Sequence, residues 1–354
     1  MEDVYKKLAV HLDNTPSGYP ETESGVELRI LKQLFTKEEA ELALSLVLML
    51  EPVEAIAKRA NKDPEEIAPL LIEMGVKGLI LHVKRDNVNT FMLLHFVVGI
   101  WEYQVNRLTK ELIRDFNEYA PCLIKDQYKH KTQQFRVVPV GKSVGTQLNI
   151  MDYEQVEDII KAQSKILVAP CICRREHEIM DRGCGKLMAS CLVFGSGAYI
   201  YENRGIGRTI SHEEALEIAE KAVKQGLVPQ PSNAKKPVNL CFCCDCCCQI
   251  LKNIKEVDAP AKIVSSNFQA VVDHDECTGC QACEEICPMN AIEMDREDIV
   301  ARVDFDRCIG CGLCVTACAF DAISLTDKKQ REKKEPPAKL MDTYMKIAQE
   351  KGLF

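Results

Sequence analysis

Polar and apolar positions in the first third of the chain alternate with a helical period, and capping signals mark the helix starts. Thr36 and Glu39 have the spacing of a capping box, and Pro52 and Pro64 each suit the first turn of a helix. The pattern predicts helices over residues 37–50, from 53 and from 64, and then a hairpin over 78–94 that turns at 85–87.

This order of helices and hairpin resembles a winged helix-turn-helix domain, and we assign it to residues 1–130. The third helix would carry Glu65, Glu66 and Glu73 toward phosphates, and Pro69 is expected to bend or shorten it. Residues 1–130 hold 16 Lys and Arg against 21 Asp and Glu, a net charge of −5. DNA is therefore not expected as a partner, and we predict a docking or dimerisation domain that could support a homo-oligomer.

The apolar run at residues 91–101 has two interpretations: the core of this domain, or an apolar docking face. Further along, residues 166–169 predict a buried strand, with helices expected after Asp152 with Gln155 and after Ser211 with Glu214. A loop is expected over 229–237. Residues 131–262 are thus predicted to form a mixed α/β domain.

Cysteine is the unusual feature of the composition, with 19 residues in a chain of 354. We see no export signal and no apolar run long enough to cross a bilayer, so a reducing cytoplasm is expected, where thiols bind metals rather than form disulfides. The length predicts two or three domains, and the net charge of −8 offers no basic field for nucleic acid.

The C-terminal part contains the spacing C-x2-C-x2-C-x3-C twice, in a duplicated unit of 31 residues. Flanking residues repeat as well, since Asn290-Ala291-Ile292 matches Asp321-Ala322-Ile323. Three closely spaced thiolates can each hold one corner of a cubane, and glycines allow a close backbone approach. Two structural zinc sites would not require a fourth cysteine three residues after the third, nor a second copy of the whole motif.

These motifs resemble the bacterial two-[4Fe–4S] ferredoxins of the clostridial type, over residues 265–326. The resemblance implies that the fourth cysteine of each motif binds the other cluster. One cluster would take Cys277, Cys280, Cys283 and Cys318, and the other Cys308, Cys311, Cys314 and Cys287. Ala319 replaces the proline found at Pro288, which affects local geometry but no ligand.

Ten more cysteines form a central group and are candidate metal ligands: Cys171, Cys173, Cys184, Cys191, Cys241, Cys243, Cys244, Cys246, Cys247 and Cys248. One or more additional iron–sulfur clusters are favoured, with a thiol/disulfide site, zinc and inert buried thiols as alternatives. If residues 241–248 are helical, the trio 243, 246, 247 or the trio 244, 247, 248 would share a face. Individual ligands are not assigned.

Polar residues near these thiols include Arg174, Arg175, Glu176, His177 and Asp245. We expect them to be solvated or to compensate charge rather than to act in catalysis, and a carboxylate at Asp245 needs a proton, a cation or a backbone donor. The segment Gly141-Lys142-Ser143 does not complete a phosphate loop because Arg136 stands where glycine is required. Neither a nucleotide nor a flavin is expected.

The sequence thus predicts a multidomain α+β protein with three parts: a winged-helix-like helical domain (1–130), a cysteine-rich α/β domain (131–262) and a ferredoxin-like two-[4Fe–4S] domain (263–327). A linker and C-terminal helix follow over 328–354. The order is similar to multidomain iron–sulfur proteins of anaerobes, which implies electron transfer with a partner oxidoreductase or flavoprotein. Whether the chain is itself an enzyme is left open: the alternatives are a reductase centred on the cysteine-rich site and a redox-sensing regulator.

Overall fold

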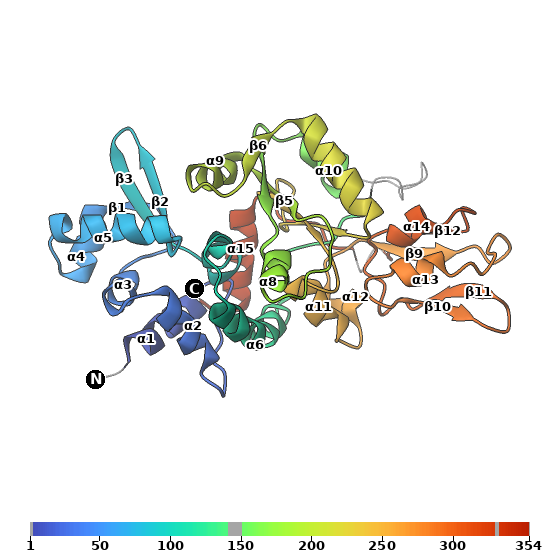
Figure 1. Cartoon of the computed structure of the whole chain (residues 1–354), viewed down its shortest axis with the longest axis horizontal. Coiled ribbons are helices and arrows are strands. Elements are labelled where there is room, and N and C mark those ends of the chain that lie inside the picture. The colour runs from blue at the N-terminus through green and yellow to red at the C-terminus, as the bar shows by residue number, and fades with distance from the viewer. Residues whose placement is uncertain (1–2, 141–150, 330–332, 354) are drawn as a thin grey trace. The chain divides into compact units, whose positions relative to one another are not determined.

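A computed structural model of the chain describes residues 3–140, 151–329 and 333–353, which belong to two compact units (Figure 1). One unit comprises Met1–His130 with Ile347–Phe354, and the other comprises Lys131–Lys346. The cysteine-rich and ferredoxin-like parts therefore belong to one compact unit. The Gly141-Lys142-Ser143 segment lies outside the described residues.

The N-terminal unit is mostly helical and has one small sheet. Its elements are α1 (Val4–Asp13), α2 (Val26–Leu34), α3 (Lys37–Ala43), β1 (Glu51–Pro52), α4 (Val53–Ala60), α5 (Pro64–Lys77), β2 (Ile80–Arg85), β3 (Val88–Leu93), the turns η1 (Phe96–Ile100) and η2 (Glu102–Gln104), and α6 (Lys110–Gln127). The strands pair in the order β1-β3-β2, all antiparallel. The capping box at Thr36, the starts of α4 and α5, and the hairpin are confirmed; the winged-helix assignment stays a prediction.

Two helix ends differ from those that the sequence pattern suggests. Helix α3 ends at Ala43 rather than near residue 50, because tertiary donors bind the next carbonyls: Arg59 Nε donates to Ser45 O over 2.7 Å, and Leu93 N to Val47 O over 2.8 Å. Helix α5 continues through Pro69 to Lys77, so of the two expected effects of this proline, shortening does not occur, and bending stays a prediction.

The aromatic side chains of residues 91–101 lie in the core. Phe91, Phe96 and Trp101 are each about 1% exposed, and the Trp101 ring stacks on Phe116 with centroids 3.7 Å apart. The docking-face interpretation of this run is therefore wrong, and the core interpretation is confirmed.

The central part of the second unit is a five-stranded antiparallel sheet with helices on it. Its elements are η4 (Asp152–Glu154), α7 (Val156–Lys161), β4 (Ile166–Pro170), α8 (Ile172–Ile179), β5 (Ala189–Phe194), α9 (Gly195–Asn203), β6 (Arg208–Ile210), α10 (His212–Lys224), β7 (Val228–Pro231), β8 (Asn239–Cys243) and α11 (Gln249–Lys255). The strand order is β6-β4-β5-β8-β7.

The predicted strand and the Ser211 cap of α10 are confirmed, because β4 begins at Ile166 and the Ser211 side chain accepts from Glu214 N. Asp152 and Gln155 do not cap a single helix: a short 3-10 turn spans Asp152–Glu154, and α7 then starts with no side-chain cap. The expected loop at 229–237 begins as strand β7, which pairs with β8.

The two faces of this sheet have different contents. Leu192, Leu240 and Phe242 join the core that includes residues of α7 and α10. Because successive side chains along a strand point to opposite faces, Cys191, Cys241 and Cys243 project from the other face. Both cysteine-bearing strands, β5 and β8, lie side by side in the sheet.

The ferredoxin-like part follows α12 (Pro260–Ile263) and consists of β9 (Phe268–Val272), α13 (Ala282–Ile286), β10 (Ile292–Asp295), β11 (Val300–Val303), α14 (Leu313–Ala317) and β12 (Ile323–Asp327). Strand β10 pairs with β11, and β12 with β9. The expected C-terminal helix is α15 (Leu340–Glu350). Among the described residues, every helix is too short or too polar to traverse a bilayer.

Candidate metal centres

The eight cysteines of the duplicated motif line two separate cavities. Cys277, Cys280, Cys283 and Cys318 line the first, which we call the outer cavity, with Phe320 and Met294 among its apolar neighbours. The second, the inner cavity, is lined by Cys287, Cys308, Cys311 and Cys314. Each cavity takes three cysteines from one motif and the fourth from the other. This is the grouping that the resemblance implies, and cluster binding by these eight residues stays a prediction.

The two halves of the ferredoxin-like part exchange strands. Cys277 Sγ accepts a hydrogen bond from Ala301 N over 3.4 Å, and Cys308 Sγ accepts one from Ala270 N over 3.4 Å. Ala301 and Ala270 are 31 residues apart, as are the two cysteines, so the repeat includes strands β11 and β9. Each motif thus receives its amide from a strand outside its own cysteine loop.

The chain around strands β9 and β11 leaves no room for a side chain at two glycines of the motifs. Gly279 and Gly310 have φ of +69° and +67°, which disfavours other residues. A Cβ at Gly310 would lie 2.1 Å from Phe268 O, and one at Gly279 would lie 2.5 Å from Ile299 O. The sequence suggests that glycine is needed for approach to a cluster; the close neighbours in the structure are the carbonyl of Phe268 in β9 and that of Ile299, the residue before β11.

The cavities differ in exposure. Cys280 of the outer cavity is exposed, whereas Cys308, Cys311 and Cys314 of the inner cavity are buried. Burial raises the pKa of Cys311 and of Cys314 well above the usual thiol value. The inner site therefore strongly favours neutral thiols until a cation replaces the protons, as expected for a buried cluster site.

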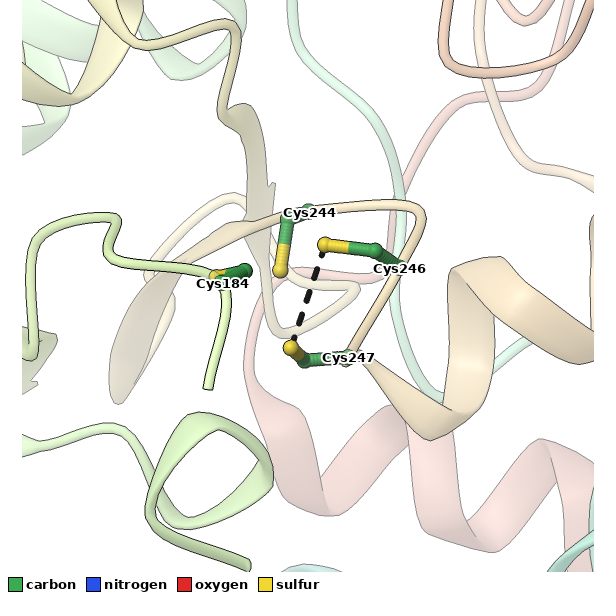
Figure 2. A group of neighbouring side chains, drawn as sticks. All are labelled: Cys184, Cys244, Cys246 and Cys247. Carbon is green, nitrogen blue, oxygen red and sulfur yellow. Dashed lines mark hydrogen bonds between the residues drawn. The ribbon is translucent and has the colours of Figure 1, made fainter. Parts of the chain in front are cut away.

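Four of the ten central cysteines converge on one point, as Figure 2 shows: Cys184, Cys244, Cys246 and Cys247. We call this the four-thiol group. Its sulfurs all lie within 4.8 Å of one another, and the Sγ atoms of Cys246 and Cys247 are 3.8 Å apart. Cys184 comes from the loop between α8 and β5, and the others from the turn between β8 and α11. A hydrogen bond from Cys247 lowers the pKa of Cys244 to about 4, so the group already favours a thiolate.

The other six central cysteines form a second set, the six-thiol group: Cys171, Cys173, Cys191, Cys241, Cys243 and Cys248. Neighbouring thiols act on one another's pKa in the order Cys171 to Cys173, Cys173 to Cys248, Cys248 to Cys243, Cys243 to Cys241, and Cys241 to Cys191. The neighbouring thiols lower the pKa of Cys241 and of Cys248 well below the ordinary value. Cys191 and Cys241 are also direct partners in the register of β5 and β8.

Arg174 connects the two groups. Its side chain is 2% exposed, both terminal nitrogens lie 3.1 Å from Phe242 O, and one lies 3.7 Å from Cys244 Sγ. Burial disfavours its charge, but the negative charges of Cys171 and Cys244 raise the pKa of Arg174 above its ordinary value. A buried guanidinium requires an anionic counterpart, and here thiolates supply it.

The other polar candidates have structural contacts. Asp245 pairs with Lys255 Nζ over 2.8 Å, so the carboxylate has the cation that its position requires. His177 Nδ1 lies 2.8 Å from Cys173 O, and Gln249 Nε2 donates to Glu176 over 3.1 Å. Arg175 pairs with Glu178 over 2.7 Å at the surface. The expectation of a solvated side chain is wrong for Arg174, Glu176 and His177, which are all buried, and holds for Arg175.

The condition for the predicted helical trios is not met. Residues up to Cys243 belong to strand β8, and Cys248 is the residue before α11, so the cysteines between them lie in a turn. Cys243 and Cys248 consequently join one group, while Cys244, Cys246 and Cys247 join the other. Sequence reasoning also missed Arg307, whose side chain donates to Met289 O and Lys255 O, both over 2.8 Å.

Comparison with known proteins bears on one part of the chain. Residues 276–322 match the family described as a 4Fe-4S dicluster domain. Neither the curated proteins nor the solved structures include a match to this chain. The chain therefore contains an iron–sulfur, ferredoxin-like domain near its C-terminus. Together with the clustered central cysteines, this domain supports a role in iron–sulfur electron transfer.

Proposed function

We propose that this protein transfers electrons through two [4Fe–4S] clusters in the outer and inner cavities to a cysteine-rich metal centre in the same unit, in exchange with a partner oxidoreductase. The observation that carries the proposal is the continuity of the path. Outer cavity, inner cavity and central thiols belong to one compact unit, and each cavity takes its fourth cysteine from the motif that lines the other.

The outer cluster would exchange electrons with the partner. Its ligand Cys280 is exposed, and Phe320, which lines the same cavity, is 50% exposed. A cluster that a partner can approach closely exchanges electrons faster than one enclosed by protein. The buried inner cluster would then pass electrons inward.

Helix α11 connects the inner cavity to the central cysteines. The charge of Lys255, its last residue, acts on Cys287 of the inner cavity, where it opposes the rise in pKa that burial causes. Arg307 of the ferredoxin-like part binds the carbonyl of Lys255. Cys248 directly precedes the same helix, whose seven residues span about 10 Å at 1.5 Å each.

The partner's binding surface would be basic. Residues 263–327 contain 3 Arg, no Lys, and 13 Asp and Glu, a net charge of −10, although the whole chain has only −8. Such a field attracts a cationic surface and accelerates encounter at low ionic strength. A redox partner with clustered Lys and Arg around its own cofactor fits this surface.

Freeze-quench electron paramagnetic resonance on the anaerobically purified chain tests the proposal. After mixing with dithionite, the signals of the two cubanes are expected first, followed by a change at the central centre. Arg307→Ala should slow the second phase, because it removes the contact with α11, and leave the first phase unchanged. Arg296→Ala, a control in the same part, should alter neither. Absence of cubane signals, or an Arg307→Ala chain identical to the control, would contradict the proposal.

A further inference from the structure

The central cysteines are divided between the two faces of the sheet. Cys191, Cys241 and Cys243 project from one face, whereas Cys244 and Cys247 belong to the core on the face of α7 and α10. Strand β8 ends at Cys243, and the turn that follows carries Cys244 and Cys247 into this core. The ten thiols therefore divide into two groups.

The four-thiol group has the dimensions of a single tetrahedral ion. Zinc binds thiolate sulfur at about 2.3 Å, so the sulfur–sulfur edge of a tetrahedral site is about 3.8 Å. The separation of Cys246 Sγ from Cys247 Sγ is 3.8 Å, and no pair in the group exceeds 4.8 Å. In a cubane each thiolate binds a different iron, which requires a wider spacing.

The ferredoxin-like part provides an internal comparison. Within the described ranges, the four-thiol group is the one set of three or more His, Cys, Asp or Glu residues whose ligand atoms could hold a single metal ion. The cysteines of the outer and inner cavities, which have the cubane spacing in sequence, do not form such a set. The same structure thus distinguishes two kinds of thiol site.

The six-thiol group is too large for one ion. Its six thiols are joined in series by five contacts. Cys191 and Cys241 are direct partners in the register of β5 and β8, Cys241 and Cys243 project from the same face of β8, and Cys241 lies close enough to Cys171 to act on it electrostatically. A tetrahedral ion takes four ligands, whereas six thiolates arranged around a space can hold several irons. Arg174, whose Nε has no acceptor among the described residues, lies beside both groups.

We propose that the central part binds two centres of different kinds: one Zn²⁺ on Cys184, Cys244, Cys246 and Cys247, and one polynuclear iron–sulfur cluster on the six-thiol group. This deepens the proposed function, on which it rests for the direction of electron flow. Zinc has no second oxidation state in proteins, so the six-thiol cluster alone would accept electrons from the inner cubane. The role of the zinc would be structural, because it would hold the turn before α11 in place.

Metal analysis of the full chain, purified without oxygen from medium containing iron and zinc, tests the proposal. The native chain is expected to hold about one zinc per four-thiol group and more than about eight iron, the content of two cubanes. Cys246→Ser, at an exposed ligand, should lose zinc and keep all iron. Cys173→Ser should keep zinc and lose only the iron above about eight. Cys122→Ser, at the cysteine outside every group, should change neither.

X-ray absorption at the zinc edge needs no variant, so its result does not depend on whether a mutant folds. On the native chain it should show zinc bound by four sulfurs at about 2.3 Å. Loss of iron rather than zinc in Cys246→Ser, or zinc bound by fewer than four sulfurs, would overturn the zinc assignment. Retention of all iron in Cys173→Ser would overturn the six-thiol cluster. The proposed function fails separately, if about eight iron are present but the cubanes cannot be reduced.

Discussion

Arg174 is the residue on which the central part depends most, and its replacement by methionine tests that dependence. Methionine fills a similar volume without charge. The change removes two hydrogen bonds to Phe242 O, one to Ser190 Oγ and one to Cys244 Sγ. Pro229, the partner of Phe242 in strand β7, has no N–H, so it cannot supply the carbonyl with another donor.

The expected loss follows from these contacts. Removing one partner of a buried charge pair costs about 3–5 kcal/mol, and for a unit of this size about 1 kcal/mol lowers the melting temperature by about 2–4 °C. Arg174→Met should therefore lower the anaerobic calorimetric transition of the second unit by about 10 °C. The melting temperature of Arg174→Lys should lie between those of the native chain and Arg174→Met, because an ammonium keeps the charge but not the planar arrangement of donors.

The neighbouring Arg175 provides the matched control. It is 48% exposed in its side chain and pairs at the surface with Glu178. Such pairs contribute at most about 1 kcal/mol, so Arg175→Met should shift the transition by no more than a few degrees. If Arg174→Met and Arg175→Met have the same melting temperature, the guanidinium is not a required counterion of the thiolates, and our account of both central groups is wrong.

Acid should destabilise the N-terminal unit, because burial lowers the pKa of His95 to about 4. The unfolded state binds this proton more tightly, so the contribution of His95 to the free energy of unfolding is complete above about pH 6.5 and falls by about 3 kcal/mol as the pH drops to about 4. Urea titrations that follow Trp101, the chain's single tryptophan, should show this fall in the free energy of unfolding with pH. An equal fall in His95→Gln would refute the assignment to His95. Phe320→Ala should shorten the lifetime in air of one cubane signal and not the other, whereas Phe305→Ala, also exposed but not lining either cavity, should change neither; equal loss of both signals would contradict the assignment of the outer cavity. Electron exchange with a basic partner should slow steeply between low and physiological ionic strength, and a rate independent of salt would exclude the acidic docking surface.

The ferredoxin-like part was the most predictable from sequence, because its signal is local. Spacing within each motif and the 31-residue repeat need no tertiary information. What the repeat does not reveal is that Gly310 meets the carbonyl of Phe268, or that Ala270 donates to Cys308, since both depend on the exchange of strands.

The central part was predictable in composition but not in arrangement. Ten cysteines indicated metal binding, yet their division depends on the register of β5 with β8 and on a turn after Cys243. Six cysteines within eight residues have no clear secondary-structure preference, and the helical period that we tested does not apply there. The burial of Arg174 likewise arises from contacts with strand β8, far away in sequence.

In the N-terminal unit, capping residues predicted where helices begin, but the sequence did not predict where helix α3 ends. Thr36 fixes the start of α3 through its own side chain. The end at Ala43 depends on Arg59 and Leu93, which reach the following carbonyls from elsewhere in the fold. Local sequence contains the first signal and lacks the second.

The central claim is that electrons pass beyond the two cubanes to a third centre in the same chain. Anaerobic coulometric reduction of the native protein measures this directly, as electrons taken up per chain. Each cubane accepts one electron in its ordinary couple, so the account predicts uptake of about three or more. Uptake of about two, with both cubanes fully reduced, would confine the redox chemistry to the ferredoxin-like part and contradict the account.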